Sequence, residues 1–353
     1  MRQLQVTDFR CLRSASLDFD PQYTLISGPN ASGKTSLLEA IYLLGRGRSF
    51  RTRKPGRLIR FDAEQFIVFG QIENAGVRVP LGIEGRSDGM RARISGRDAT
   101  SMADVALQFP VQIIDPEVHR LIEEGPHTRR RFLDWGVFHV EPRFLASWHR
   151  YRQALSQRNA ALRAGQNEAL VSLWNPELIR AGTEMSEARC SYVAALAASA
   201  SPVVERLLGA RLTLRYQPGW AQDVGFAQAL ERTWIADVQR GATQVGPHRG
   251  ELIVQIDGLP AREHISRGQQ KLLAAALLIA QLELFAQRRV IRPTLLLDDP
   301  AAELDDGRLG ALLVEVLRVS PQLIVTTLQP RFAALGQPGV QWRVEAGSFS
   351  ALD

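Results

Sequence analysis

Cysteine is scarce in this sequence. The 353 residues include two, Cys11 and Cys190, which lie far apart and lack the paired spacing of a zinc site or a disulfide framework. Histidine is also sparse, with six residues that show no metal-ligand pattern. We therefore expect neither a disulfide scaffold nor a zinc centre, and we expect a protein of the reducing cytoplasm.

Long hydrophobic runs are missing as well. The longest strongly apolar run covers residues 272–280, far short of the roughly 20 residues that a membrane-spanning helix needs. The opening residues MRQL contain no apolar core of a secretory signal. The sequence thus predicts a cytoplasmic protein without a membrane partner.

Positive charge exceeds negative charge. Lysine and arginine total 43 against 37 acidic residues, which gives a formal net charge of +6 and a pI of about 9.8. This balance favours a polyanionic partner such as nucleic acid. The hydrophobic fraction of 45% and charged fraction of 23% are those of a globular protein with a sizeable core.

The chain changes character along its length. Short strand-like stretches occur at residues 3–8, 15–19 and 23–27, and alternating polarity at 66–97 predicts antiparallel strands. Residues 116–208 are rich in Ala, Leu, Arg, Gln and Glu and predict several helices. Strand patterns return at 212–216, 251–257, 294–298 and 322–327, with helices expected at 269–286 and 306–318. We expect one α/β domain built from residues 1–115 and 209–353, interrupted by a helical lobe at 116–208 that has no long coiled coil.

A phosphate-binding loop follows the strand expected at residues 23–27. Residues 28–35 match GxxxxGK[ST] in full and precede a segment of helical composition. In this motif the glycines let backbone N–H groups face the phosphates, Lys34 reaches the β- and γ-phosphates, and the Thr35 hydroxyl ligates Mg²⁺. No Asn-Lys-x-Asp guanine-reading motif is present, which favours ATP over GTP. The predicted ATP-binding residues are Gly28, Pro29, Asn30, Ala31, Ser32, Gly33, Lys34 and Thr35.

An acidic pair closes a late apolar stretch. Residues 294–299 read TLLLDD, the pattern of a Walker B strand. Asp298 would then hold Mg²⁺ together with Thr35, and Asp299 is the candidate general base for the attacking water. The alternative is a core strand capped by two solvated acids, which the upstream P-loop disfavours. We assign catalytic roles to Asp299, Asp298 and Lys34.

A signature-like loop precedes this strand. Residues 265–271 read ISRGQQK and lead into a long segment of helical composition. The loop resembles the ABC signature, here Ser266, Arg267, Gly268 and Gln269, in which Ser266, the Gly268 backbone and the start of the following helix would contact a γ-phosphate. An ordinary helix N-cap is the alternative. Residues 302–305, AELD, match the D-loop of this superfamily. In ABC heads the signature completes the site of a second head, so one P-loop and one signature imply an ATP-bridged homodimer.

Beyond the ATPase motifs, the sequence resembles the RecF family of bacterial recombination mediators. The resemblance is carried by DFR at residues 8–10, LLEAIY at 37–42, GRSFRT at 47–52, RRFLD at 130–134 and GPHR at 246–249. It implies an ABC-type ATPase head of the P-loop NTPase class with an inserted helical lobe, close to SMC heads but without their long coiled coil.

The same resemblance implies a function. It implies a homodimer, formed with ATP and Mg²⁺, that binds gapped, single-stranded or junction DNA and works with RecO and RecR to load recombinase. Replication maintenance, SOS induction and a weak DNA-stimulated ATPase acting as a switch belong to this role. Two departures, PAA at residues 300–302 and Thr327 where many ABC ATPases have histidine, argue against fast hydrolysis but leave ATP binding intact.

A run of arginines marks a candidate DNA surface. Residues 46–57 contain several cations and no acid, and we assign phosphate contacts to Arg46, Arg48, Arg51 and Arg53. A solvated loop is the alternative. A second cluster, at residues 129–131, could serve the same purpose or be structural. Neither cluster carries regularly spaced aromatic residues, so base-specific readout is not indicated.

Two other functions share these motifs. An ABC transporter ATPase subunit has the same three motifs but usually two adjacent glycines in its signature, where this chain has Arg267. An ATP-gated clamp with incidental hydrolysis is compatible with Asp299, where a glutamate is commoner. A nuclease is the weakest alternative, since no further carboxylate cluster is evident.

Overall fold

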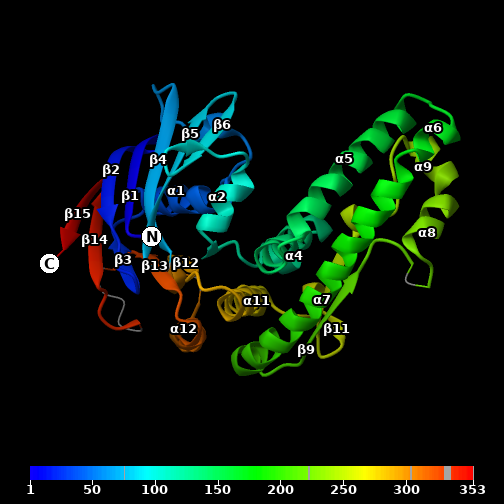
Figure 1. Cartoon of the computed structure of the whole chain (residues 1–353). Helices are drawn as coiled ribbons and strands as arrows, with labels where there is room; N and C mark the ends of the chain where they lie inside the picture. The colour runs from blue at the N-terminus through cyan, green and yellow to red at the C-terminus, as the bar shows by residue number, and fades with distance from the viewer. Residues whose placement is uncertain (75, 222, 303, 330–334, 353) are drawn as a thin grey trace. The chain divides into compact units, whose positions relative to one another are not determined.

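The computed structural model describes residues 1–74, 76–221, 223–302, 304–329 and 335–352 (Figure 1). The chain divides into two compact units: unit 1 comprises Met1–Val118 and Phe285–Asp353, and unit 2 comprises His119–Leu284. Unit 2 begins close to the expected start of the helical lobe but extends well past residue 208. Residues 209–284 lie in unit 2 because strands β9 (Leu212–Gln217) and β10 (Glu251–Ile256) pack against helices α7 (Asn175–Leu208) and α4 (Pro126–Val140).

One face of unit 1 is an antiparallel sheet with the order β2-β1-β4-β5-β6-β7. Its strands alternate between buried and exposed positions, as expected for a sheet with one face on a core and one in water. The strands expected at 66–97 are confirmed as β4 to β7. The bounds are β1 (Gln3–Phe9), β2 (Leu12–Asp18), β4 (Gln65–Asn74), β5 (Val77–Arg86), β6 (Gly89–Ile94) and β7 (Arg97–Asp98).

The second sheet of unit 1 has the order β15-β14-β3-β13-β12-β8 and is parallel except for the β14–β15 pair. Every residue of β3 and β12 is buried, as in parallel strands covered on both faces. The strands expected at 23–27, 294–298 and 322–327 are confirmed. The bounds are β3 (Tyr23–Ser27), β8 (Val111–Ile114), β12 (Thr294–Asp298), β13 (Gln322–Thr327), β14 (Val340–Glu345) and β15 (Ser348–Leu352).

Helix α1 (Lys34–Arg46) lies between the two sheets (Figure 1). Its apolar side chains share one core with Val68 and Leu81 of the antiparallel sheet and with Leu296 and Ile324 of the parallel sheet. The first turn of α1 is thereby fixed at the carboxyl-terminal edge of the parallel strands. The remaining short elements of unit 1 are η1 (Pro55–Leu58), α2 (Met102–Gln108), η3 (Pro300–Ala302) and α12 (Asp306–Val319).

Unit 2 is built on the long helices α5 (Phe144–Arg163) and α7, which pack along each other, beside a small antiparallel sheet of order β11-β10-β9. The longest described helix, α7, has 34 residues, so the described residues form no extended coiled-coil arm. The other elements are α3 (Arg120–Glu123), α6 (Glu168–Ser172), α8 (Phe226–Arg232), α9 (Trp234–Arg240), η2 (Pro247–Arg249), β11 (Leu259–Pro260), α10 (Ala261–His264) and α11 (Arg267–Arg288), whose last turn belongs to unit 1.

Candidate functional site

The predicted phosphate loop connects the end of β3 to the start of α1. A Cβ on Gly28 would stand 2.2 Å from the carbonyl oxygen of Val344, so this glycine is required by the close approach of β14. Gly33 has a φ of +114°, a conformation that other residues rarely adopt, and a Cβ there would meet Leu12 at 2.9 Å. The two glycines therefore serve different purposes, one of packing and one of backbone conformation.

Lys34 opens α1 and folds its side chain back over this loop. Its Nζ donates hydrogen bonds to the carbonyl oxygens of Gly28 at 2.6 Å and Pro29 at 2.8 Å. Burial lowers the pKa of Lys34, while the nearby Asp299 and Asp298 act in the opposite direction. Ser32 lies in the same loop, and its buried Oγ has no hydrogen-bond partner among the described residues. The loop thus offers an ammonium group and an unused hydroxyl to a ligand.

The two predicted magnesium ligands lie together. Thr35 Oγ1 donates a hydrogen bond to Asp298 Oδ2 at 3.0 Å. Thr326 on β13 faces Asp298 across the parallel register and donates its own hydroxyl to Asp298 Oδ1 at 2.7 Å. A hydroxyl beside a carboxylate is the hard oxygen donor set that Mg²⁺ prefers, so these residues fit the ion.

Asp299 follows directly and has an unusual backbone conformation. Its φ is +47°, and its N–H donates to the carbonyl oxygen and the hydroxyl of Thr326 at 3.1 and 3.2 Å. Burial raises the pKa of Asp299, Lys34 opposes this change, and Asp298 adds to it. A carboxylate with a raised pKa is a better proton acceptor than an ordinary one, which is what a general base requires.

The signature-like loop lies in unit 2, at the start of α11. Ser266 Oγ accepts a hydrogen bond from the Gln269 N–H at 3.3 Å, and Gln269 Oε1 accepts one from the Ser266 N–H at 2.9 Å. This reciprocal pair is a capping box, so the N-cap alternative describes the local structure correctly. Arg267 donates to His119 Nε2 at 2.9 Å, a contact that nothing local in the sequence suggested. Within the D-loop match, Glu303 lies outside the described residues.

The four arginines assigned to DNA are not equivalent. Arg46 and Arg48 are half-buried, with the Arg46 guanidinium over the ring of Tyr42, whereas Arg51 and Arg53 are exposed. Arg51 Nη1 lies 3.5 Å from the fully buried Glu39, which also forms a bidentate ion pair with Arg10. Glu39 and Arg10 were not predicted as partners, because nothing in a sequence pairs residues of a helix and a turn 29 positions apart.

The second arginine cluster is part of the packing of unit 2. Arg129 forms an ion pair with Glu251 at 2.9 Å, and Arg130 donates to the carbonyl oxygen of Gly250 at 2.8 Å. All three arginines of the cluster are half-buried. These contacts bind α4 to the first residue of β10 and to Gly250 just before that strand, which favours the structural alternative for residues 129–131.

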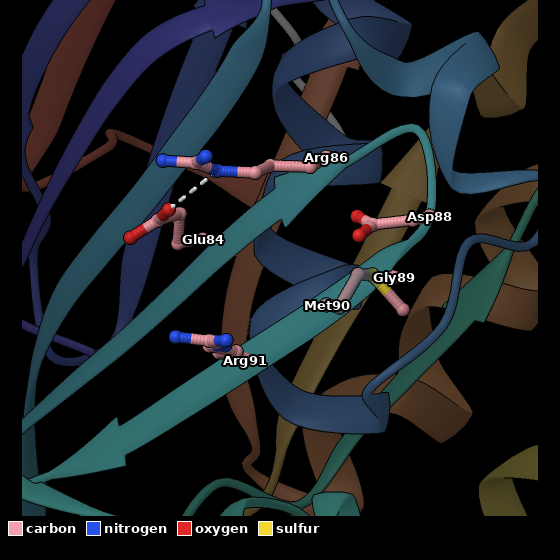
Figure 2. Close-up of a pocket in the computed structure, with 6 residues that line it drawn as sticks. All are labelled: Glu84, Arg86, Asp88, Gly89, Met90 and Arg91. Carbon is pink, nitrogen blue, oxygen red and sulfur yellow. Dashed lines mark hydrogen bonds and ion pairs between the residues drawn. The ribbon is translucent and has the colours of Figure 1, made fainter.

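A small pocket lies on the β5–β6 hairpin of unit 1. Figure 2 shows Glu84 and Arg86 on β5, paired at 3.2 Å, with Arg91 on β6 projecting from the same side of the hairpin. Asp88 occupies the turn. Acids and arginines balance here, so this pocket offers no net positive charge to a polyanion.

Within the described residues, no helix combines the length and the hydropathy needed to span a bilayer. The residues that sequence reasoning missed at the candidate ATP site are Thr326, which positions Asp298, and Val344, which packs on Gly28. No motif marks either of them, because each acts through a pairing between strands distant in sequence.

Comparison with known proteins identifies the family. The model for the RecF/RecN/SMC N-terminal domain matches residues 1–345. A DNA replication and repair protein RecF from Yersinia enterocolitica is 37% identical over 351 residues, which cover 98% of this chain and 97% of the relative. The RecF protein of Escherichia fergusonii is 38% identical over 330 residues, or 93% and 92% of the two chains.

Solved structures are also similar to this chain. A structure of the recombination mediator protein RecF with ATP, in the RecFOR pathway, matches with a TM-score of 0.91 at 28% identity and covers 100% of this chain and 97% of that one. An SMC head domain from Pyrococcus furiosus matches with a TM-score of 0.58 at 16% identity, covering 99% and 95%, which shows a shared fold. The expected fold class, an α/β ABC-type ATPase head without a long coiled coil, is confirmed. The chain belongs to the RecF family, within the proteins that carry the RecF/RecN/SMC N-terminal domain.

Proposed function

We propose that the chain binds ATP with Mg²⁺ and uses it to form a DNA-binding homodimer. The observation that carries this proposal is the 3.0 Å contact between Thr35 Oγ1 and Asp298 Oδ2 at the mouth of the P-loop. Ligands in open α/β sheets bind outside the carboxyl ends of the strands, where this contact lies. The matching structure of RecF with ATP supports ATP as the ligand.

Each site residue has a distinct role in this proposal. Thr35 and Asp298 would hold Mg²⁺, which when bound neutralises charge on the β- and γ-phosphates. Lys34 would leave the carbonyl oxygens of Gly28 and Pro29 for phosphate oxygens. Asp299 would accept a proton from the attacking water. Asp299 would be the single carboxylate base, and Thr327 stands where many ABC ATPases have a histidine. Both features support slow hydrolysis, which suits a protein that uses ATP as a switch.

The signature loop would act in trans. Ser266, Arg267, Gly268 and Gln269 stand at the N-terminal end of α11, a helix of 22 residues whose N–H groups and dipole favour an anion. The capping box holds this loop in one conformation. We propose that the loop contacts the γ-phosphate held by a second copy of the chain, which makes the dimer depend on ATP.

DNA would be the substrate of the dimer. The curated relatives are DNA replication and repair proteins, the matching RecF structure is described within the RecFOR pathway, and the net charge is +6. We propose that the protein acts in the cytoplasm on gapped, single-stranded or junction DNA with RecO and RecR, loading recombinase and supporting SOS induction. Arg46, Arg48, Arg51 and Arg53 would contribute phosphate contacts, chiefly through the exposed pair Arg51 and Arg53.

DNA-binding anisotropy on a gapped duplex tests this function. With ATP or a non-hydrolysable analogue we expect retention of the DNA, and with ADP its release. Equal retention with ATP, with ADP and without nucleotide would contradict an ATP-gated protein. DNA retention that outlasts hydrolysis would favour the clamp alternative. None of the relatives reported above supports a transporter subunit.

A further inference from the structure

The GPHR segment, residues 246–249, has no place in the ATP or DNA assignments above, yet unit 2 holds it firmly. His248 Nε2 lies 3.1 Å from the carbonyl oxygen of Thr243. Because a carbonyl can only accept, Nε2 carries the proton, and Nδ1 accepts a hydrogen bond from the Tyr151 hydroxyl at 2.6 Å. A Cβ on Gly246 would stand 2.4 Å from that hydroxyl, so this turn has no room to shift toward α5.

A buried ion pair fixes the other end of the same loop. Arg158 and Asp237 are 1% and 0% exposed, and Arg158 Nη1 donates to Asp237 Oδ2 at 2.8 Å and to Thr243 Oγ1 at 2.7 Å. Asp237 Oδ1 accepts the Gln244 N–H at 2.8 Å, and Asn159 Oδ1 accepts the Thr243 N–H at the same distance. These hydrogen bonds from buried side chains hold residues 243 and 244 in one conformation.

This rigid loop brings two exposed guanidinium groups together. Gln244 Oε1 accepts a hydrogen bond from Arg240 Nη1 at 2.6 Å and another from Arg249 Nη2 at 3.0 Å. The amide is oriented by its own Nε2, which donates to the carbonyl oxygen of Ala242 at 2.6 Å. In the described part of the chain, neither arginine pairs with a carboxylate. Two cations held at one neutral oxygen repel each other unless an anion joins them.

A third arginine, Arg163, lies beside this pair, and we call the place where the three meet the corner. Gly241 ends α9 with a φ of +60°, and a Cβ there would stand 3.0 Å from Cγ of Arg163. The aliphatic stem of Arg163 therefore lies against this glycine, and its side chain is exposed. The corner thus has three exposed arginines on α5, α9 and η2.

We propose that Arg240 and Arg249, with Arg163 beside them, form a phosphate-binding site for a nucleic-acid backbone. Guanidinium groups match phosphate oxygens with paired, planar hydrogen bonds, and the shared amide oxygen sets their spacing. None of the described residues named at this site is aromatic, so a backbone phosphate fits better than a stacked base. The proposal rests on the DNA-binding function above and extends it to unit 2.

The test compares charge variants of the full chain on a fluorescent gapped duplex across a salt series. For Arg240→Gln/Arg249→Gln, we expect weaker binding and a salt slope that flattens by nearly two, since each duplex phosphate contact contributes about 0.9 to that slope. The matched control is Arg215→Gln on β9, which removes one exposed arginine elsewhere in unit 2 and should change little.

A second variant separates binding from folding. Gln244→Glu places a carboxylate between the two arginines without removing either. The two new ion pairs should offset the lost hydrogen bond from Gln244 Nε2 to Ala242, so the variant should keep its thermal midpoint of unfolding while binding DNA more weakly. Wild-type affinity and slope in both variants would overturn the site while leaving the proposed function intact. If the wild-type chain itself binds no DNA, both the proposed phosphate site and the proposed DNA-binding function are wrong. Poly-glutamate serves as a probe for an acidic peptide. If the two variants lose binding to poly-glutamate but bind DNA as the wild type does, the site binds an acidic peptide and the proposal is overturned.

Discussion

Thr35 Oγ1 lies 3.0 Å from Asp298 Oδ2, although 263 positions separate the two residues in the chain. The contact exists because the phosphate loop joins the end of β3 to the start of α1, and β3 and β12 both flank β13 in the parallel sheet. Two motifs from opposite ends of the chain thus meet at one edge of one sheet.

Lys34→Ala should remove tight ATP binding and leave the fold intact. The variant loses a charged donor to the phosphates, worth about 2–3 kcal/mol, or roughly 30- to 150-fold in affinity. The backbone loop, shaped by Gly28 and Gly33, is unchanged. Calorimetric titration with ATP measures this, with Lys54→Ala, an exposed lysine outside the loop, as the control. Near-normal affinity in Lys34→Ala would refute the phosphate-loop assignment.

Asp299→Asn should still bind ATP but hydrolyse it more slowly, by roughly 10²- to 10⁴-fold. The base must be deprotonated, so wild-type hydrolysis should fall as pH falls through the raised pKa of Asp299, above the range of an ordinary aspartate. The variant should lack that acid limb.

The raised pKa of Asp299 also predicts how Asp299→Asn changes the stability of the fold. A raised pKa means that the folded state holds the proton more tightly, so stability falls as the pH rises from the ordinary aspartate pKa through the raised pKa of Asp299, and the loss is complete above it. Asp299→Asn should therefore be no less stable at neutral pH, and asparagine tolerates a φ of +47°. Hydrolysis equal to wild type, with the same pH profile, would exclude Asp299 as the base.

The local structure of the candidate ATP site was largely predictable because a P-loop is contiguous. Residues 28–35 appear in the sequence in the order in which the structure uses them, and TLLLDD gave both the strand and its acids. Thr326 and Glu39 could not be found in this way, since their roles come from strand register and side-chain packing. The division of the chain was also harder to predict, because β9 and β10 read like strands of the head but pack on the helices of unit 2.

Asp237→Ala should destabilise the protein by about 3–5 kcal/mol, because it leaves the buried Arg158 without its carboxylate partner. Chemical denaturation measures the change in the free energy of unfolding. Glu177→Ala is the matched control, since it breaks partly exposed ion pairs with Arg150 and Arg180 and should cost less than about 1 kcal/mol. Similar losses in the two variants would show that the Arg158–Asp237 pair does not anchor its loop.

Neutralising Arg46, Arg48, Arg51 and Arg53 together should weaken binding to all DNA sequences about equally and flatten the salt dependence. The exposed pair should account for most of the change in slope, and the half-buried pair for most of any loss in thermal stability. A salt series on the quadruple variant and on Arg51→Gln/Arg53→Gln measures both. An unchanged slope in a folded quadruple variant would move the DNA contacts away from this loop.

Sedimentation velocity of the wild-type chain and of Ser266→Arg, each with ATP and with ADP, tests the ATP-bridged dimer most directly. We expect ATP, and not ADP, to convert the wild-type chain from monomer to dimer. Ser266→Arg should remain monomeric while binding ATP normally, because its P-loop is untouched and the new side chain would meet the nucleotide of the second copy. Ser266→Thr, which keeps a capping hydroxyl, should dimerise like wild type. ATP-induced dimers of normal stability in Ser266→Arg would contradict a signature that acts in trans.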